Sequence, residues 1–303
     1  MIKEGVQPLD SLRLVANYAA QAPCYICGDD NTYDAELCRQ CFAPMALTHQ
    51  AASQKIRPRL LATIGASGVG KTVYLGMLMD MLSRQPDRLQ MLARGAFSIT
   101  LQQSTASALA RGEFPSKTPS EPDRWNWVHC QIRSPSLKIP LDLVMPDLAG
   151  EALLEEVDHP HTYDVIHPLL SKCAGVLILI DAVKLQAGSL DQDYFTMKLL
   201  SYLAEIDERP KHGWARRPIG FVLTKADECE ECFVDPARFA EVRAPGFWRQ
   251  CRERFRNYQF FASGVAGGCA YRQTRAGLVR VPLRVEPRGI VEPFEWLVQQ
   301  VKS

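Results

Sequence analysis

A glycine-rich segment from Gly65 to Thr72 carries the clearest chemical signal in the chain. It reads Gly-Ala-Ser-Gly-Val-Gly-Lys-Thr and fits the phosphate-loop pattern G-x-x-x-x-G-K-[ST] completely. Its glycines let the backbone wrap so that amides point at phosphate oxygens, and the N-terminus of the following helix adds positive potential. We expect Lys71 to bridge the β- and γ-phosphates of a nucleotide and the Thr72 hydroxyl to bind Mg²⁺. The contacts predicted here are Gly65, Ser67, Gly68, Val69, Gly70, Lys71, Thr72 and Val73.

A second signal is Asp147-Leu-Ala-Gly150, which follows an alternating apolar segment at 139–146 and resembles the D-x-x-G element of GTPases. The resemblance implies that Asp147 holds Mg²⁺, in most such proteins through water. It also implies that the Gly150 amide contacts the γ-phosphate and senses its loss. The alternative is an ordinary strand exit, which the position after an expected hairpin disfavours.

The base-reading signal is Thr224-Lys225-Ala-Asp227, at the end of an expected strand at 219–224. It resembles the [NT]-K-x-D element, in which Asp227 accepts from guanine N1 and N2 while the Lys225 stem lies along the ring. With adenine the carboxylate would stay unpaired, at a cost on the order of a thousandfold in affinity. Thr224 stands where Asn is usual, so we expect the loss of an amide that ties the base loop to the phosphate loop. Ser263, after a strand at 258–262, is similar to the segment that contacts guanine O6 through backbone amides.

Together these elements resemble the Ras-like and translation-factor class of P-loop GTPases over residues 59–303. Several details are similar to bacterial double-GTPase-like proteins, which are associated with conflict and defence gene clusters. These details are the long helical insertion before the switch, the Pro-Ser-Lys-Thr-Pro segment at 115–119, Glu151, and the Arg-Gly-Ile-Val-Glu-Pro segment near the C-terminus.

The proline-broken loop at 111–122 is the expected first switch, because GTPases close a threonine over Mg²⁺ and the γ-phosphate. Thr118 is the first candidate, Ser116 the second, and an inert loop the alternative. Glu151 stands where Ras-like proteins carry glutamine; an ionised glutamate can accept from water but cannot donate to the transition state. With Lys71, Thr118 and Glu151 as the catalytic set, we expect slow turnover, unless Glu151 is merely a surface residue.

Two cysteine pairs, Cys24-x-x-Cys27 and Cys38-x-x-Cys41, have the spacing of two zinc knuckles. Four thiolates can hold Zn²⁺ tetrahedrally at about 2.3 Å, and this resembles a short zinc ribbon. Free or disulfide-bonded cysteines and an iron–sulfur site are the alternatives. Cys229-x-x-Cys232 lacks a second pair, so we interpret it as two incidental thiols.

The composition is that of a globular chain with a substantial core, and its charge is balanced. The chain has 303 residues, 47 % of them hydrophobic, with 35 Lys and Arg against 34 Asp and Glu. We find no secretory signal and no transmembrane run, and we expect a cytoplasmic protein. Residues 238–288 hold a local arginine excess that could dock an acidic partner or nucleic acid, but a solvated helix face is favoured.

The elements that must position these residues alternate strand, loop and helix. We expect strands at 60–64, 175–181, 219–224 and 258–262, and helices at 9–20, 72–82, 98–110, 190–206, 246–256 and 292–301. We also expect antiparallel hairpins at 127–144 and around 279–285. The predicted fold is α/β: a Ras-like P-loop sheet, mostly parallel with one antiparallel hairpin, flanked by helices and preceded by a small zinc ribbon. The predicted organisation is a helical segment at 1–21, the ribbon at 22–45, a linker at 46–58 and the GTPase domain at 59–303.

The predicted cofactors are therefore GTP or GDP, Mg²⁺ and Zn²⁺. The favoured function is a GTP-dependent switch that controls a protein effector, with nucleic acid the less favoured partner. A GTP-locked scaffold with negligible hydrolysis is the alternative. An ATP-using P-loop enzyme would require the segment at 224–227 to be accidental.

Overall fold

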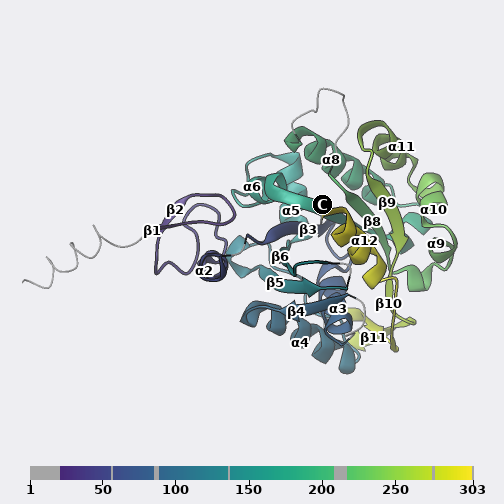
Figure 1. Ribbon diagram of the computed structural model, residues 1–303. Helices are drawn as coiled ribbons and strands as arrows, with labels where there is room; N and C mark the ends of the chain where they lie inside the picture. Colours follow the sequence, from purple (N-terminus) through teal and green to yellow (C-terminus); the bar gives the residue numbers. More distant parts are fainter. Residues whose placement is uncertain are drawn as a thin grey trace, which may run out of the picture.

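The computed structural model describes residues 21–55, 57–84, 89–135, 137–207, 217–274 and 277–301. The helix expected at 9–20 lies outside these residues. At the centre is a seven-stranded sheet in the order β4-β5-β6-β3-β7-β8-β9 (Figure 1). Its strands are β3 (Arg59–Gly65), β4 (Gln90–Ala93), β5 (Asn126–Arg133), β6 (Leu141–Asp147), β7 (Cys173–Asp181), β8 (Ile219–Thr224) and β9 (Tyr258–Ala262).

Strand direction confirms the expected mixed sheet. β3 pairs in parallel with β6 on one side and β7 on the other, and β7-β8-β9 continue in parallel. β5 pairs antiparallel with β6, as the hairpin pattern predicts, and β4 adds an antiparallel edge that the sequence analysis does not anticipate. Because β3 has parallel partners on both sides, a crevice opens at the carboxyl end of this strand.

Helices cover both faces of the sheet. They are α3 (Lys71–Ser83), α4 (Ala96–Ala110), α5 (Gly150–Asp158), α6 (Ile166–Lys172), α7 (Ala182–Gln186), α8 (Asp191–Ile206), α9 (Glu231–Val234), α10 (Pro236–Arg243), α11 (Pro245–Arg254) and α12 (Val291–Val301). Short 3₁₀ turns lie at Pro122–Arg124 and Ala226–Glu228. The helices expected at 72–82, 98–110, 190–206, 246–256 and 292–301 are all present within a few residues.

The two-residue period of the strands divides the core in two. Leu60, Ala62 and Ile64 of β3 pack on the face covered by α5, α6, α8 and α11. Leu61, between them, faces the side covered by α3, α4 and α12. A strand buried on both faces needs a continuous apolar run, and this is what β3 and β7 have.

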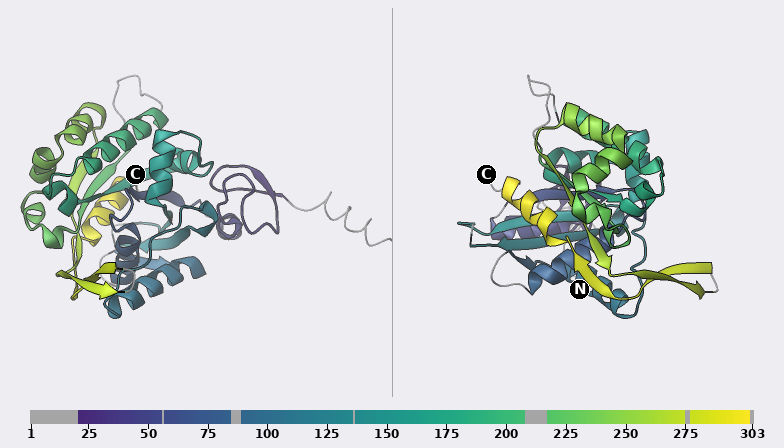
Figure 2. Two further views of the ribbon diagram at one scale, coloured as in Figure 1. Left: turned by 180° about the vertical axis from the view of Figure 1, so that it is seen from behind. Right: turned by 90° about the vertical axis from the view of Figure 1, so that its right-hand side faces the viewer.

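A long antiparallel arm interrupts the domain between β9 and α12. Its base is β10 (Gly264–Ala266) paired with β13 (Val285–Arg288), and its outer part is β11 (Cys269–Thr274) paired with β12 (Gly277–Pro282). The right-hand view of Figure 2 shows it projecting from the domain. The expected hairpin around 279–285 is therefore corrected: residues 277–282 and 285–288 do not pair with each other, because each has an upstream partner.

The cysteine module forms a small unit beside the amino end of β3 (Figure 1). It contains β1 (Gln21–Pro23), paired antiparallel with β2 (Asp30–Thr32). The segment predicted as a linker contains a helix, α2 (Met45–Gln54). Gln50 Oε1 of α2 lies 2.6 Å from Nδ1 of His129 on β5, so this segment is packed against the sheet domain.

No helix among the described residues is long and apolar enough to span a membrane.

Candidate functional site

The carboxyl ends of the parallel strands surround a cavity of about 270 Å³. Loops from distant parts of the chain meet there because parallel strands present their carboxyl ends at one edge of a sheet. The predicted nucleotide residues that line it are Ser67, Gly68, Val69, Gly70, Lys71, Thr72, Val73, Thr118, Gly150, Thr224, Lys225, Asp227 and Ser263. Gly65, Asp147 and Glu151 do not line it, but each contacts a residue that does.

The phosphate loop has the backbone conformation that its glycines allow. Gly68 and Gly70 have φ of +75° and +99°, a region that other residues rarely adopt. A Cβ on Gly65 would lie 2.4 Å from the Leu179 carbonyl oxygen, so glycine is also required for the approach to β7. Helix α3 begins directly after Gly70, with its N-terminus at the cavity.

Lys71 is folded back over this loop. Its Nζ donates to the carbonyl oxygens of Gly65 and Ala66, at 2.9 and 3.0 Å. The residue is 6 % exposed, and burial lowers the pKa of Lys71 to about 8, against the opposing effect of Asp147 and Glu151. A phosphate group would supply the negative charge that this buried ammonium lacks.

Three oxygen-bearing side chains meet at the phosphate end. The Thr72 and Thr118 hydroxyls each donate to Oδ2 of Asp147 at 2.9 Å, and the two hydroxyl oxygens are 3.0 Å apart. Asp147 is fully buried; burial raises its pKa, and the two hydroxyl hydrogen bonds oppose that rise. Two hydroxyls and a carboxylate are hard oxygen ligands of the kind Mg²⁺ prefers. The chain thus brings together the three residues predicted to hold Mg²⁺, from α3, the 111–122 loop and β6.

The residues after Asp147 touch the phosphate loop directly. A Cβ on Gly150 would lie 2.4 Å from the Ser67 backbone nitrogen, so only glycine permits this contact. The exposed Glu151 accepts a hydrogen bond from Ser67 Oγ at 3.0 Å. Lys117 Nζ, on the first switch loop, is 3.7 Å from the same carboxylate oxygen. Glu151 therefore links the phosphate loop to the switch loop, whereas its predicted catalytic role stays a prediction.

Thr224 corrects one expectation about the base end. Its hydroxyl lies 2.8 Å from the Val69 carbonyl oxygen of the phosphate loop and 3.1 Å from that of Ile180. Threonine therefore supplies the tie between base loop and phosphate loop that we expected the missing asparagine to remove. Lys225 adopts a left-handed conformation, with φ of +58°, and its ammonium pairs with the buried carboxylate of Asp181.

Asp227 presents an unsatisfied carboxylate oxygen at the same end. Oδ2 is buried without a hydrogen-bond partner, and burial raises the pKa of this carboxyl. An acceptor left unpaired in a cavity fits a ligand that donates two N–H groups, as guanine does at N1 and N2. Ser263 lies beside it, but its own N–H already donates to the Leu223 carbonyl at 2.8 Å. If a backbone amide binds guanine O6 as predicted, it belongs to a residue after Ser263.

Two cavity residues are absent from the sequence-based set. Arg280, on β12 of the arm, and Phe114, on the first switch loop, both line the cavity. The Arg280 guanidinium carbon lies 5.4 Å from the Phe114 ring centroid. No local motif marks either residue; only the arginine excess at 238–288 gave any signal for Arg280.

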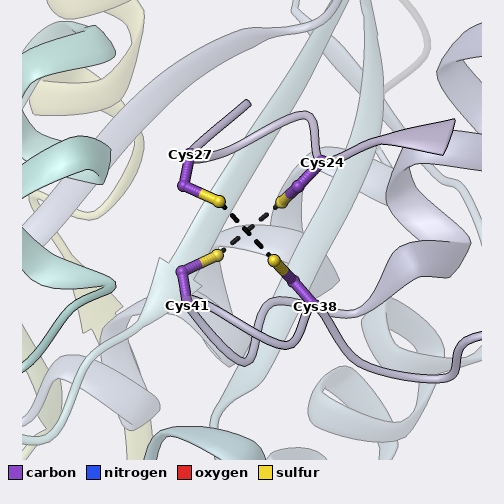
Figure 3. A group of neighbouring side chains, drawn as sticks. All are labelled: Cys24, Cys27, Cys38 and Cys41. Atoms are coloured by element: carbon purple, nitrogen blue, oxygen red, sulfur yellow. Dashed lines mark hydrogen bonds between the residues drawn. The ribbon is translucent and has the colours of Figure 1, made fainter. Parts of the chain in front are cut away.

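The four predicted zinc ligands converge in the N-terminal module (Figure 3). Their ligand atoms all lie within 4.8 Å of one another, with Cys24 and Cys41 Sγ 3.6 Å apart and Cys27 and Cys38 Sγ 3.5 Å apart. A tetrahedron of zinc–sulfur bonds of about 2.3 Å places its sulfurs about 3.8 Å apart, so the spacing fits. It is also much too long for disulfide bonds.

Backbone amides lie close to three of the four sulfurs. Backbone amides of Ile26, Asp29 and Gln40 point at the sulfurs of Cys24, Cys27 and Cys38, at 3.4 to 3.5 Å. The hydrogen bond from Cys41 lowers the pKa of Cys24 to about 5, whereas burial raises the pKa of Cys27 to about 11 and the hydrogen bond to Cys24 raises the pKa of Cys41. Such outer contacts orient metal ligands, and the four cysteines fit a zinc ribbon.

The remaining candidates have simpler explanations. Cys229 and Cys232 are buried against each other, with Sγ atoms 3.3 Å apart, and belong to no ligand cluster in the described ranges. In α11, the Phe247 side chain is fully buried, as the solvated-face interpretation of this helix requires. Several arginines of the 238–288 segment form ion pairs with acidic side chains: Arg238, Arg243, Arg272, Arg280, Arg284 and Arg288.

Comparison with solved structures finds similar chains at low identity. A nucleolar GTP-binding protein 1 from Plasmodium falciparum is 12 % identical, covering 81 % of this chain and 87 % of its own, with a TM-score of 0.40. The GTP-bound Ski7 GTPase-like domain of S. cerevisiae is 15 % identical, covering 80 % of this chain and 50 % of its own, with a TM-score of 0.43. A signal recognition particle receptor complex from Chaetomium thermophilum is 14 % identical, covering 68 % and 90 %, with a TM-score of 0.35. No curated protein matches the chain.

A sequence model of the family described as Double-GTPase 1 matches residues 62–193. This region contains the phosphate loop, Thr118, Asp147 and Gly150. The base-reading segment at 224–227 lies beyond it but closes the same cavity. Residues 62–193 thus match the Double-GTPase 1 family model and carry the phosphate-binding half of the cavity, behind a four-cysteine module that fits a zinc ribbon.

Proposed function

We propose that this protein is a GTP-binding switch that hydrolyses GTP slowly with Mg²⁺ and controls a partner protein. One observation carries the proposal: a single cavity joins the Thr72–Thr118–Asp147 cluster at one end to the unpaired Oδ2 oxygen of Asp227 at the other. The first end suits Mg²⁺ and phosphates, and the second suits a base that donates two hydrogen bonds.

The switch itself would consist of the loop at 111–122 and the start of α5. Thr118 reaches Asp147 from that loop, and Lys117 faces Glu151 on α5. Mg²⁺ and the γ-phosphate would hold both segments, and loss of the phosphate would release them. The surface around these segments is where we place the effector.

Slow turnover follows from the position of Glu151. Its carboxylate accepts from Ser67 Oγ on the phosphate loop, so a negative charge lies beside the site of the phosphates. A carboxylate there can orient water but cannot donate to the charge that develops in the transition state. The same observation supports the second candidate, a scaffold that holds GTP almost without hydrolysis.

The compartment, the zinc site and the biological role are proposed from the cysteines and from the family match. All ten cysteines are free, which supports a reducing compartment such as the cytoplasm. The four clustered cysteines would bind one Zn²⁺ as a structural site. The Double-GTPase 1 match supports a role in a bacterial conflict or defence system, because double-GTPase-like proteins are associated with such gene clusters.

Calorimetric titration of the zinc-loaded protein with GTP, GDP and ATP analogues in Mg²⁺ tests base choice. We expect ATP to bind at least about a hundredfold more weakly than GTP, because adenine leaves the Asp227 carboxylate unpaired. Asp227→Ala should abolish this preference, and Asp164→Ala, at an exposed carboxylate on another loop, should keep it. Equal binding of ATP and GTP would contradict the proposal.

Phosphate release separates the two candidates. Sustained release above that of Lys71→Ala supports the switch, and release equal to that variant supports the scaffold.

A further inference from the structure

Arg280 reaches the nucleotide cavity from the arm rather than from the sheet. β12 carries it to the base end, where it pairs with Glu228, the residue after Asp227. Burial lowers the pKa of Arg280, and the negative charges of Asp227 and Asp181 oppose this shift. Asp227 lines the base end of the cavity and Asp181 pairs with Lys225 beside it, so Arg280 lies at the base end.

The other cations that line the cavity already have partners. Lys71 donates to the phosphate-loop carbonyls. Lys117 faces Glu151 at the phosphate end. Lys225 pairs with the buried Asp181. Arg280 also has an ion-pair partner, Glu228, but a guanidinium has five N–H donors and can hold a carboxylate with one edge while presenting another.

Guanine needs donors as well as an acceptor. Asp227 can accept hydrogen bonds from N1–H and N2–H, which leaves the acceptors O6 and N7 on the adjoining edge. The Thr224 hydroxyl faces two backbone carbonyls, and the Ser263 N–H is bonded to Leu223. Among the charged side chains described at this end, Arg280 has the planar fork that matches two neighbouring acceptors.

We propose that Arg280 is a guanine-specificity residue whose guanidinium donates to N7 and O6 of the base. This inference rests on the proposed GTP-binding function and adds a second base reader to Asp227. Adenine presents an amino group in place of O6, so the same fork would meet a donor and favour guanine further. The Phe114 ring, 5.4 Å from the guanidinium carbon, helps to hold the side chain at the cavity from the switch-loop side.

The test pairs a deletion on the protein with a deletion on the ligand. Dissociation constants are measured for GTP and for 7-deaza-GTP, which carries C–H in place of N7, with the full chain and with Arg280→Ala. We expect wild-type protein to bind 7-deaza-GTP more weakly than GTP, and Arg280→Ala to bind GTP roughly tenfold or more weakly than wild type. The substitution should cost much less with 7-deaza-GTP, because the hydrogen bond to N7 is already absent.

Two further variants guard the interpretation. Arg272→Ala removes an arginine from the same arm, where it pairs with Glu113 outside the cavity, and should leave both affinities unchanged. Arg280→Lys keeps the charge and the fold but loses the fork, so it should resemble Arg280→Ala in its response to the analogue. Equal wild-type affinity for the two ligands, or equal losses on Arg280→Ala, would overturn the proposal for Arg280 while leaving GTP binding intact. Failure of the wild type to bind GTP would instead overturn the proposed function and this inference with it.

Discussion

Individual side chains in this site do two jobs, binding a ligand and holding neighbouring loops together. Thr224 shows the second job plainly, because its hydroxyl joins β8 to the phosphate loop through the Val69 carbonyl. Lys71 does both, since its ammonium is hydrogen-bonded to a loop carbonyl and is also the group expected to bind phosphate, although it is almost completely buried. Such groups should respond to conditions that leave exposed residues unaffected.

Lys71 predicts a pH dependence of nucleotide binding. Burial lowers its pKa to about 8 in the free protein, and phosphate would restore the charged form, so binding requires a proton as the pH rises above about 8. We expect GTP affinity to fall about fourfold between pH 7 and about pH 8.5. Titrations across this range check it, with Lys71→Arg as the comparison because arginine does not titrate there. A flat profile for wild-type protein would contradict the assignment.

Glu151 predicts a rate change. Glu151→Gln keeps an acceptor for Ser67 but adds a donor and removes the negative charge beside the phosphates. We expect single-turnover hydrolysis of bound GTP to rise roughly tenfold. Glu155→Gln is the matched control, because Glu155 is exposed on the same helix and bonds to Tyr163 instead. An unchanged rate in Glu151→Gln would remove the residue from the catalytic set.

At the scale of elements, the cysteine module shows how a very small unit can be held in place. β1 and β2 have three residues each, too few for an independent hairpin. The module instead has its cysteine cluster and α2, whose Gln50 contacts His129 on β5. Its buried residues belong to the same cluster as the sheet face that contains Leu60, so the module extends the main core.

Metal removal tests this arrangement. We expect one Zn²⁺ per chain by mass spectrometry, and none in Cys38→Ala. Chelation under reducing conditions should unfold the module and lower the melting temperature, since metal binding supplies the folding energy of such units. GTP affinity should change little, because the module adjoins the amino end of β3 and the phosphate loop follows its carboxyl end (Figure 1). Full zinc content in Cys38→Ala would contradict the four-cysteine site, and Cys251→Ala, outside the cluster, should keep its zinc.

At the scale of the whole molecule, the sequence predicted best what local patterns encode. The apolar run of β3, the glycine loop and the start of α3 follow one another without a gap, so strand, loop and helix were predictable together. The hairpin of β5 and β6 was predictable from its alternation and its proline-containing turn. The four cysteines were predictable from spacing alone.

What the sequence did not predict depends on contacts between distant segments. α2 lies in a stretch with a weak apolar stripe, and Gln50 finds its partner on a strand far along the chain. β4 has four residues and exists as an edge because β5 pairs with it. The prediction of a hairpin around 279–285 found strands in the right place but paired them wrongly. Alternation of apolar and polar residues indicates a strand but does not indicate which strand it pairs with. Arg280 belongs to the cavity for the same reason, through the pairing of the arm.

Because the arm between β9 and α12 carries part of the base end of the nucleotide cavity, that end can change in sequence and length independently of the phosphate end. Gly264 and Arg288 are opposite each other in the β10–β13 pair, so the insertion leaves and rejoins the domain at neighbouring points. A change in the length of an insertion whose ends are neighbours changes the loop-closure entropy only slightly and need not disturb the seven-stranded sheet. The rim around the base can therefore be rebuilt by insertion or deletion, while the phosphate loop and Asp147 stay fixed to strands that tolerate neither.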